Sequence, residues 1–230
     1  MLYPEKLHNT ITILGLALAT GAWCQTPDRT LVYSETTRGT ESATVWYDCF
    51  VSADGSTRIK GQSSNATFEA TLGTSSETVR WIETPSGKGK SIELRRKGSS
   101  FDLITGDSST EIDVPAEPWY QMLVQLSTFA AGPHAETRFC SYMSRMDERL
   151  KSGDMTVFTA KKIGKQRIPR GTGTTDAWKV RVTFADYRSM FWGAWYWYAV
   201  DDGTLLRYEE VRGGPGTPTT VGTLVEDTGR

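Results

Sequence analysis

The chain has 230 residues, of which 38% are hydrophobic and 22 are glycine, and its formal net charge is −1 at pH 7. A chain so close to neutral has no strong electrostatic field, which excludes attachment to nucleic acid or to an anionic membrane surface by general charge attraction. This length, with a composition rich in Gly, Ser and Thr, is typical of one all-β domain with short strands and many turns.

The N-terminal segment has the layout of a secretory signal peptide: a polar start, a short apolar run and then small residues. The apolar run is too short to cross a bilayer, which takes roughly 20 apolar residues, so no transmembrane segment is predicted. We expect residues 1–24 to be a signal peptide and residues 25–230 to form a single exported β-rich domain, periplasmic in a Gram-negative bacterium or secreted. The alternatives are a buried N-terminal helix and a lipid attached at Cys24, although Trp23 stands where lipoproteins carry a small residue.

From Arg29 onward the sequence predicts one strand after another. Gly- and Ser-rich turns separate runs of strand-forming residues about every 8–12 residues, which is typical of an antiparallel meander. Several runs alternate charged and apolar residues, so one face of the sheet packs and the other is wet. In the first half of the chain the expected strands are residues 45–51, 65–72, 77–84, 90–96, 100–105 and 110–114, and the run at residues 54–62 follows a turn at Asp54-Gly55.

One segment in the middle of the chain breaks this rhythm. In residues 117–130, apolar side chains recur at helical spacing, among them Trp119, Met122 and Leu126. Pro118 fits the first turn of a helix, where its missing N–H costs nothing. We therefore expect one amphipathic helix of about three turns, lying on the apolar face of a long antiparallel sheet.

Strands resume after this helix, and one hairpin turns at Asp201-Asp202-Gly203, a sequence typical of tight turns. A loop is expected before residue 178. The chain as a whole thus predicts about a dozen strands. The expected strands in the second half are residues 136–145, 154–163, 178–184, 194–200, 204–211 and 221–226.

Residues 191–198, FWGAWYWY, are unusually aromatic. In a strand, Trp195 and Trp197 share one face, and the two Tyr that alternate with them share the other. One interpretation is a central strand that the helix covers on one side and loops cover on the other. The second is an aromatic wall of a concave cavity for acyl chains or similar ligands, and a third is the stacking of sugars on Trp. Arg207 on the following strand would hold an anionic head group, or else pair with a glutamate.

The residue types that catalysis uses are scarce. Outside the predicted signal peptide the one histidine is His134, so neither a Ser-His-Asp triad nor a His-rich metal site can be built. Gly106-Asp107-Ser108 is similar to a motif of certain esterases, but its place between two strand-like runs favours a hairpin turn. Glu209 and Glu210 point to opposite faces of a strand and make a poor pair for glycoside hydrolysis. We expect no catalytic residue, no metal and no cofactor.

The cysteines leave two alternatives open. If Cys24 leaves with the signal peptide, Cys49 and Cys140 remain. In an exported protein two such cysteines either form a disulfide or stay as separate buried thiols, and spacing alone does not decide between these.

The C-terminal strands carry a family resemblance. Residues 176–226, with AWKVRVTF, AWYWYAV, DDG, LLRYEE and GGPGTP in that order, resemble an uncharacterised family of exported bacterial proteins, as does EPWYQML in the middle of the chain. That family is distantly similar to domains of unknown function with a LolA/LolB-like fold. The resemblance implies an incomplete antiparallel β-barrel with a helix in its concave face. The better-known proteins with this fold carry lipids or lipid-modified cargo. The resemblance implies no catalytic residues.

The sequence and the resemblance together predict a mainly β protein: a single antiparallel, strongly curved open barrel with one helix packed on its concave face. We expect a non-enzymatic binder of a lipid-like or other apolar ligand inside the curved sheet. The alternatives are a structural or interaction module for an envelope protein, with a filled core, and, less favoured, a hydrolase. The candidate ligand-binding residues are Trp119, Met122, Leu126, Trp195, Trp197 and Arg207.

Overall fold

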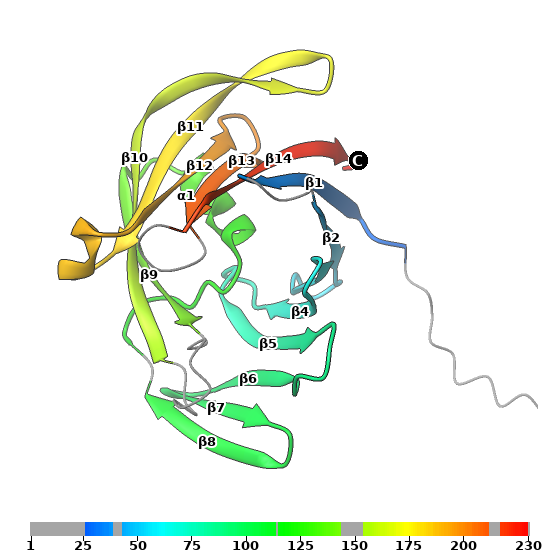
Figure 1. Cartoon of the computed structure of the whole chain (residues 1–230), viewed down its shortest axis with the longest axis vertical. Helices are drawn as coiled ribbons and strands as arrows, with labels where there is room; N and C mark the ends of the chain where they lie inside the picture. Colours follow the sequence, from blue (N-terminus) through cyan, green and yellow to red (C-terminus); the bar gives the residue numbers. More distant parts are fainter. Residues whose placement is uncertain (1–25, 39–42, 114, 144–153, 212–216, 230) are drawn as a thin grey trace, which may run out of the picture.

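The computed structural model describes residues 26–38, 43–113, 115–143, 154–211 and 217–229. The predicted signal peptide lies outside these residues. Within them the chain forms a single 14-stranded antiparallel sheet that is not closed, with one short α-helix and two 3-10 turns (Figure 1). No helix in this part of the chain is long and apolar enough to cross a membrane. The expected mainly β, single-sheet fold is confirmed.

The strands fall into two runs, one on each side of the helical segment. The first run is β1 (Arg29–Thr37), β2 (Ala43–Val51), β3 (Thr57–Gln62), β4 (Ala66–Leu72), β5 (Thr78–Pro85), β6 (Ile92–Lys97), β7 (Ser100–Thr105) and β8 (Ser108–Asp113). The second run is β9 (Glu136–Met143), β10 (Asp154–Arg170), β11 (Gly173–Phe184), β12 (Gly193–Ala199), β13 (Leu205–Val211) and β14 (Thr219–Asp227). The helical elements are η1 (Leu123–Leu126), α1 (Ser127–Ala131) and η2 (Tyr187–Met190).

Each run is a meander, and the first strand of the chain joins it to the last. The strand order is β8-β7-β6-β5-β4-β3-β2-β1-β14-β13-β12-β11-β10-β9. The two edge strands, β8 and β9, are therefore consecutive in sequence. The sheet curls until β8 approaches β10 without pairing with it, which gives the open barrel seen in Figure 1.

The loop expected before residue 178 is instead part of a long hairpin. β10 continues to Arg170 and β11 begins at Gly173, with the ladder paired throughout apart from one register shift. Gly171, in the turn, has a φ of +58°, a backbone conformation that glycine adopts without steric cost. The sequence Gly-Thr-Gly-Thr at residues 171–174 suggested a loop, but the glycine belongs to a tight turn and threonine is common in strands.

The segment between the two edge strands runs through the concave interior (Figure 1). We call residues 115–131 the inner segment. The helix expected over residues 117–130 is wrong in its extent, because only η1 and α1 are helical, from Leu123 to Ala131. What is confirmed is that one short helix lies inside the curved sheet.

The first part of the inner segment is extended because its peptide groups bond to a strand. Trp119 forms a parallel bridge with Cys140 of β9. The Cys140 N–H donates to the Pro118 carbonyl at 2.9 Å, and the Tyr120 N–H donates to the Cys140 carbonyl at 2.9 Å. A helix would need these same groups for its own bonds, so the tertiary pairing overrides the helical spacing of the side chains.

Alternation along the strands separates the faces of the sheet. Two clusters of buried residues lie on the concave face, where they pack against the inner segment, one around Leu126 and Tyr198 and one around Trp119 and Leu94. A third and smaller cluster lies on the convex face and comprises Ile168, Ala177, Trp197, Ala199 and Leu206.

Candidate ligand-binding pocket

Two rows of paired residues cross the concave face, with one residue on each strand. The first row runs from β2 to β5 and pairs Tyr47, Gly61, Phe68 and Glu83 in that order. The second row runs from β12 to β1 and pairs Tyr196, Tyr208, Gly222 and Glu35. Each row therefore holds two aromatic rings, one glycine and a terminal glutamate.

The glycines make room for the rings. A Cβ on Gly61 would lie 2.1 Å from Cε2 of Phe68, and a Cβ on Gly222 would lie 2.0 Å from Cζ of Tyr208. Since no side chain could stand at either position, each ring lies flat over the neighbouring strand. This covering of a strand glycine by a cross-strand aromatic ring shields the backbone there from water.

Tyr33 on β1 links the two rows into one aromatic arc, which we define as Tyr196, Tyr208, Tyr33, Tyr47, Phe68 and Trp81. The Tyr33 ring centroid lies 5.8 Å from that of Tyr208 and 5.7 Å from that of Tyr47. At the far end, Phe68 stacks on Trp81 at 5.4 Å. These separations are those of favourable aromatic pairs, so the arc is a continuous apolar surface on the concave face.

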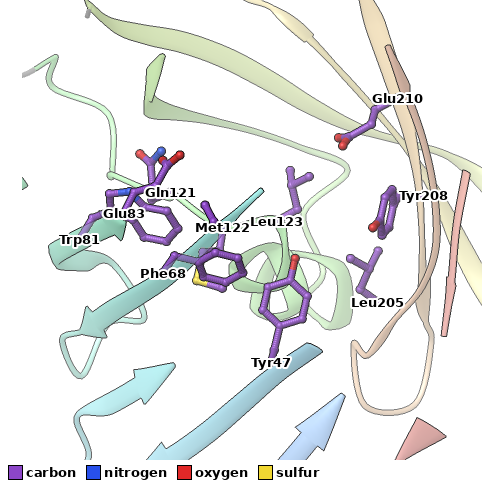
Figure 2. Close-up of a pocket in the computed structure, with 11 residues that line it drawn as sticks. Tyr47, Phe68, Trp81, Glu83, Gln121, Met122, Leu123, Leu205, Tyr208 and Glu210 are labelled. Carbon is purple, nitrogen blue, oxygen red and sulfur yellow. The ribbon is translucent and has the colours of Figure 1, made fainter. Parts of the chain in front are cut away.

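A pocket of about 430 Å³ opens between the aromatic arc and the inner segment (Figure 2). The arc contributes Tyr47, Phe68, Trp81 and Tyr208, and the inner segment faces them with Gln121, Met122 and Leu123. The full lining is Tyr47, Ala66, Phe68, Trp81, Glu83, Gln121, Met122, Leu123, Leu205, Tyr208 and Glu210. A concave, largely apolar cavity of this size with a few polar groups is the usual form of a small-molecule site.

Gln125 fixes the inner segment against the turn before β5. Its side chain is buried and donates to the Ser76 carbonyl at 2.9 Å, while its Oε1 accepts from the Thr78 hydroxyl at 3.0 Å. The same Oε1 accepts from the Met122 N–H at 2.8 Å. Ser76 has a φ of +64°, which is uncommon for a residue other than glycine, and the bond to its carbonyl helps to hold this turn.

Gln121 fixes the other end of the same wall to the edge strand β9. Its side-chain amide donates to the Tyr142 carbonyl at 3.0 Å and its oxygen accepts from the Tyr142 N–H at 2.9 Å. The Trp119 indole donates to the same oxygen at 2.9 Å. The inner wall of the pocket is thus anchored to β5 on one side and to β9 on the other.

Among the described residues that line the pocket, the charged groups are two carboxylates on opposite sides of it. On β5, burial raises the pKa of the Glu83 carboxyl, and a hydrogen bond from the Trp81 side chain acts in the opposite direction. On β13, Glu210 accepts a hydrogen bond from the Tyr196 hydroxyl at 3.0 Å. Behind the lining, the Tyr208 hydroxyl donates to the buried Glu35 carboxylate.

The structure places the three predicted site residues of the inner segment on the concave side, but only one of them lines the pocket. Met122 is in the lining. Trp119 is fully buried, and its ring packs edge-on against that of Phe101 with the centroids 4.3 Å apart. Its side chain therefore packs the inner segment against the sheet and does not face the cavity. Leu126 is buried in the cluster that contains Tyr198.

Trp195, Trp197 and Arg207 lie on the opposite, convex face, and the expectation that they share a wall with the inner segment needs correction. The Lys179 ammonium lies 4.2 Å from the Trp195 ring centroid, and the Arg207 guanidinium lies 5.3 Å from that of Trp197. Arg207 pairs with Glu209, the second role considered for it. The strand is buried on both faces, and long cationic side chains rather than loops cover its convex side.

Cys49 and Cys140 are free cysteines, so the structure has the second of the two alternatives, separate thiols. Burial raises the pKa of Cys49 to about 11 and that of Cys140 to about 12. The Cys140 thiol lies 3.5 Å from the Glu117 carbonyl, its hydrogen-bond acceptor. Thiols of such high pKa are poor nucleophiles at neutral pH.

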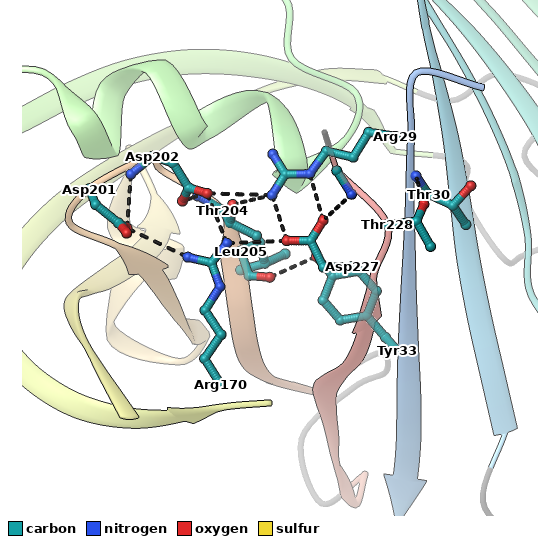
Figure 3. Close-up of polar contacts among 11 residues, drawn as sticks. Arg29, Thr30, Tyr33, Arg170, Asp201, Asp202, Thr204, Leu205, Asp227 and Thr228 are labelled. Atoms are coloured by element: carbon teal, nitrogen blue, oxygen red, sulfur yellow. Dashed lines mark hydrogen bonds and ion pairs between the residues drawn. The ribbon is translucent and has the colours of Figure 1, made fainter. Parts of the chain in front are cut away.

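A second polar group of residues ties the ends of four elements together at one rim of the barrel (Figure 3). Arg29 on β1 holds Asp227 on β14 with two hydrogen bonds, at 2.9 and 2.8 Å. Arg170, at the end of β10, donates to Asp202 at 2.9 Å and to Asp227 at 3.1 Å. Asp201 lies 3.6 Å from Arg170 as well, so two guanidinium groups face three carboxylates, and the cluster is a structural clamp that joins the first strand to the last.

Several residues that line the pocket were not predicted from the sequence. Tyr47, Phe68, Trp81 and Glu83 come from strands that were correctly predicted, but no local pattern marks them as a site. Two features of the sequence could have pointed to them. They lie on the apolar side of alternating strands, and Gly61 and Gly222 stand inside strand-like runs, where a glycine indicates that another group approaches the backbone closely.

No protein-family model matches the sequence, and no curated protein matches it either. Among solved structures, the beta-barrel-like protein of the domain of unknown function DUF1849 from Brucella abortus is similar to this chain with a TM-score of 0.59 at 10% identity, over 86% of this chain and 96% of that one. This likeness shows a shared fold, and the predicted resemblance to a domain of unknown function is confirmed at that level.

Two further solved structures are more distant. The hypothetical lipoprotein YmcC from Escherichia coli has a TM-score of 0.43 at 10% identity, over 85% of this chain and 83% of its own. The LolA superfamily protein NE2245 from Nitrosomonas europaea has a TM-score of 0.26 at 8% identity, over 88% of this chain and 84% of its own.

Proposed function

We propose that this protein is a non-enzymatic binder of an apolar or amphipathic ligand, held in the pocket between the aromatic arc and the inner segment. The observation that carries the proposal is the cavity of about 430 Å³ with Tyr47, Phe68, Trp81 and Tyr208 on one side and Met122 and Leu123 on the other. Large aromatic faces and an adaptable Met side chain suit an apolar guest of variable shape.

The cavity also separates this proposal from its main alternative, a structural module with a filled core. In a filled core, apolar rings contact one another on all sides and leave no space larger than a water molecule. Here open space remains between part of the arc and the inner segment, which Gln121 anchors to β9 and Gln125 anchors to the turn before β5.

The proposal includes export. The N-terminal layout supports removal of residues 1–24, and the mature domain would then act in the cell envelope or outside the cell. Intact-mass measurement of the protein from the periplasmic or secreted fraction tests this. A mass that lacks the first 24 residues or so supports it, and a full-length mass in the cytoplasm contradicts it.

The binding test uses N-phenyl-1-naphthylamine, a neutral apolar probe that fluoresces when it leaves water. We expect saturable binding to the mature protein and its loss in Leu123→Trp, which fills the cavity. The Leu123 carbonyl accepts from the Tyr198 hydroxyl at 2.9 Å, and this backbone contact is unaffected by the substitution. Val225→Trp, at a position that is 61% exposed, is the matched control.

Absence of saturable binding to the wild-type protein would overturn the proposal. Equal binding by Leu123→Trp and wild type would move the site away from this pocket. Native mass spectrometry of protein purified without detergent detects the natural ligand. We expect an added mass that disappears on solvent extraction and is absent from Leu123→Trp.

A further inference from the structure

The sign of the charge in the pocket restricts what it can bind. Among the described residues that line it, the charged side chains are Glu83 and Glu210, both acidic, and none is Lys, Arg or His. A head group whose only charge is a carboxylate or a phosphate would meet like charges in a partly desolvated cavity, which is unfavourable.

Glu83 stands directly among aromatic rings. It is the cross-strand partner of Phe68, whose ring stacks on Trp81 at 5.4 Å, and Trp81 precedes it by two residues on the same face of β5. Across Gly61, the Tyr47 ring centroid lies 5.4 Å from that of Phe68. Figure 2 shows Glu83, Trp81 and Phe68 together at one end of the pocket, with Tyr47 on the side of Phe68 away from Trp81.

Aromatic faces beside a carboxylate form the arrangement that recognises ammonium groups. The negative face of an aromatic ring attracts a cation within about 6 Å of its centroid, and the attraction is stronger when both are desolvated. A carboxylate adds full charge compensation. The burial that raises the pKa of Glu83 makes its charged form costly in the empty pocket, and a bound cation would offset that cost.

We propose that the pocket selects amphipathic ammonium compounds, with the ammonium group between Glu83 and the rings of Tyr47, Phe68 and Trp81. The apolar part of the ligand lies along Met122, Leu123, Leu205 and Tyr208. This inference rests on the proposed function and adds the chemical class of the ligand. The ammonium group belongs either to a simple amphiphilic amine or to a zwitterionic lipid head group.

The test compares four probes that share one dodecyl chain: dodecyltrimethylammonium, dodecylphosphocholine, dodecyl maltoside and dodecyl sulfate. Each is titrated by calorimetry below its micelle concentration into the mature protein. We expect dodecyltrimethylammonium to bind at least about tenfold more tightly than dodecyl maltoside, and dodecyl sulfate to bind weakest. Dodecylphosphocholine binding as tightly as the trimethylammonium probe assigns the ligand to zwitterionic lipids, and weaker binding assigns it to simple amines.

Two variants locate the effect. Glu83→Gln keeps the size of the side chain and one acceptor oxygen and removes its charge, so it should reduce the preference for the ammonium probe over maltoside to near unity. Glu69→Gln, on β4 beside Phe68 but on the other face of the sheet, should leave the preference unchanged.

The outcomes separate this inference from the function on which it rests. If maltoside or sulfate binds as tightly as the ammonium probe, the ammonium selectivity is wrong and the pocket remains an apolar site. If none of the four probes binds, the proposed function itself fails. A preference that survives Glu83→Gln overturns the role given to that carboxylate.

Discussion

The ring of Tyr208 on β13 lies over Gly222, its cross-strand partner on β14, and reaches past it to donate its hydroxyl hydrogen to Glu35 on β1. One side chain thus spans three strands because the middle strand presents no side chain of its own. This contact stands where the first and last strands of the chain meet, so it helps to join the two meanders into one sheet.

Replacing Gly222 should therefore disturb more than one strand. In Gly222→Ala the new methyl would lie 2.0 Å from Cζ of Tyr208, so the ring must move and the bond to Glu35 is lost. We expect a loss of about 1–3 kcal/mol in the free energy of unfolding, measured by urea titration. Gly164→Ala on β10, where nothing lies within 4 Å, is the matched control and should change stability by less than about 0.5 kcal/mol. Equal effects of the two substitutions would contradict this account.

Gln125→Ala tests the anchor of the inner segment. The substitution leaves the Ser76 carbonyl, the Thr78 hydroxyl and the Met122 N–H without their partner. We expect a loss of about 1–3 kcal/mol in unfolding free energy and faster amide hydrogen exchange in η1 and α1. Gln62→Ala, at an exposed position on β3, should do neither. Unchanged exchange in the inner segment of Gln125→Ala would show that other contacts hold it.

The clamp at the rim predicts a pH dependence. Partial burial raises the pKa of Asp202, but hydrogen bonds from Arg170 and Thr204 outweigh it and lower the pKa from 3.8 to about 2. A carboxyl whose pKa is lower in the folded chain than in the unfolded chain stabilises the fold above its unfolded pKa, and this stabilisation disappears as the pH falls through the folded value. The wild type should therefore lose stability between about pH 4 and pH 2.

In Asp202→Asn the loss of stability over this pH range should be smaller, and stability at neutral pH should be lower. Denaturant titrations at a series of pH values measure both. Asp107→Asn, in the exposed β7–β8 turn, is the control outside the clamp. If Asp202→Asn and the wild type lose stability in parallel on acidification, Asp202 does not contribute to the pH dependence.

The contribution of Glu83 to stability should change with pH in the opposite direction to that of Asp202. Because burial raises its pKa in the folded chain, this carboxyl favours the fold most at low pH, and that contribution is lost as the pH rises through the folded pKa. Glu83→Gln, which is neutral at every pH, should therefore raise the melting temperature at pH 7. Glu69→Gln should not. A lower melting temperature for Glu83→Gln at pH 7 would mean that the charged group is stabilised by its surroundings in the absence of ligand.

Trp195→Ala separates the two faces of the aromatic strand β12. The Trp195 ring lies on the convex face under Lys179 and Arg181, so its removal should leave the binding of N-phenyl-1-naphthylamine unchanged. Phe68→Ala opens the aromatic arc inside the pocket and should weaken the binding. Reduced probe binding in Trp195→Ala but not in Phe68→Ala would place the site on the convex face.

Local patterns were sufficient for the strands and for most turns. The run at residues 100–105 is β7 without any shift, and Gly106-Asp107 is the hairpin turn expected there, with a φ of +60° at Gly106. These features depend on side-chain alternation and on glycine's access to positive φ, both of which are properties of a few neighbouring residues. The same reasoning failed at residues 117–122, where bonds to β9 and to Thr78 hold the chain extended against its helical spacing.

The amino-acid sequence by itself determined that this is a mainly β, antiparallel protein with one helical segment in the middle of the chain, because the alternation and turn residues along the chain leave few other choices. It could not determine which side of β12 faces inward, since Trp195 and Trp197 on one side and Tyr196 and Tyr198 on the other are equally apolar. Tertiary structure decided this: the curvature of the sheet and the Leu123 carbonyl that receives the Tyr198 hydroxyl bring the tyrosines inside. The pocket follows from the same cause, because its lining comes from strands far apart in sequence that only the curvature of the open sheet brings together.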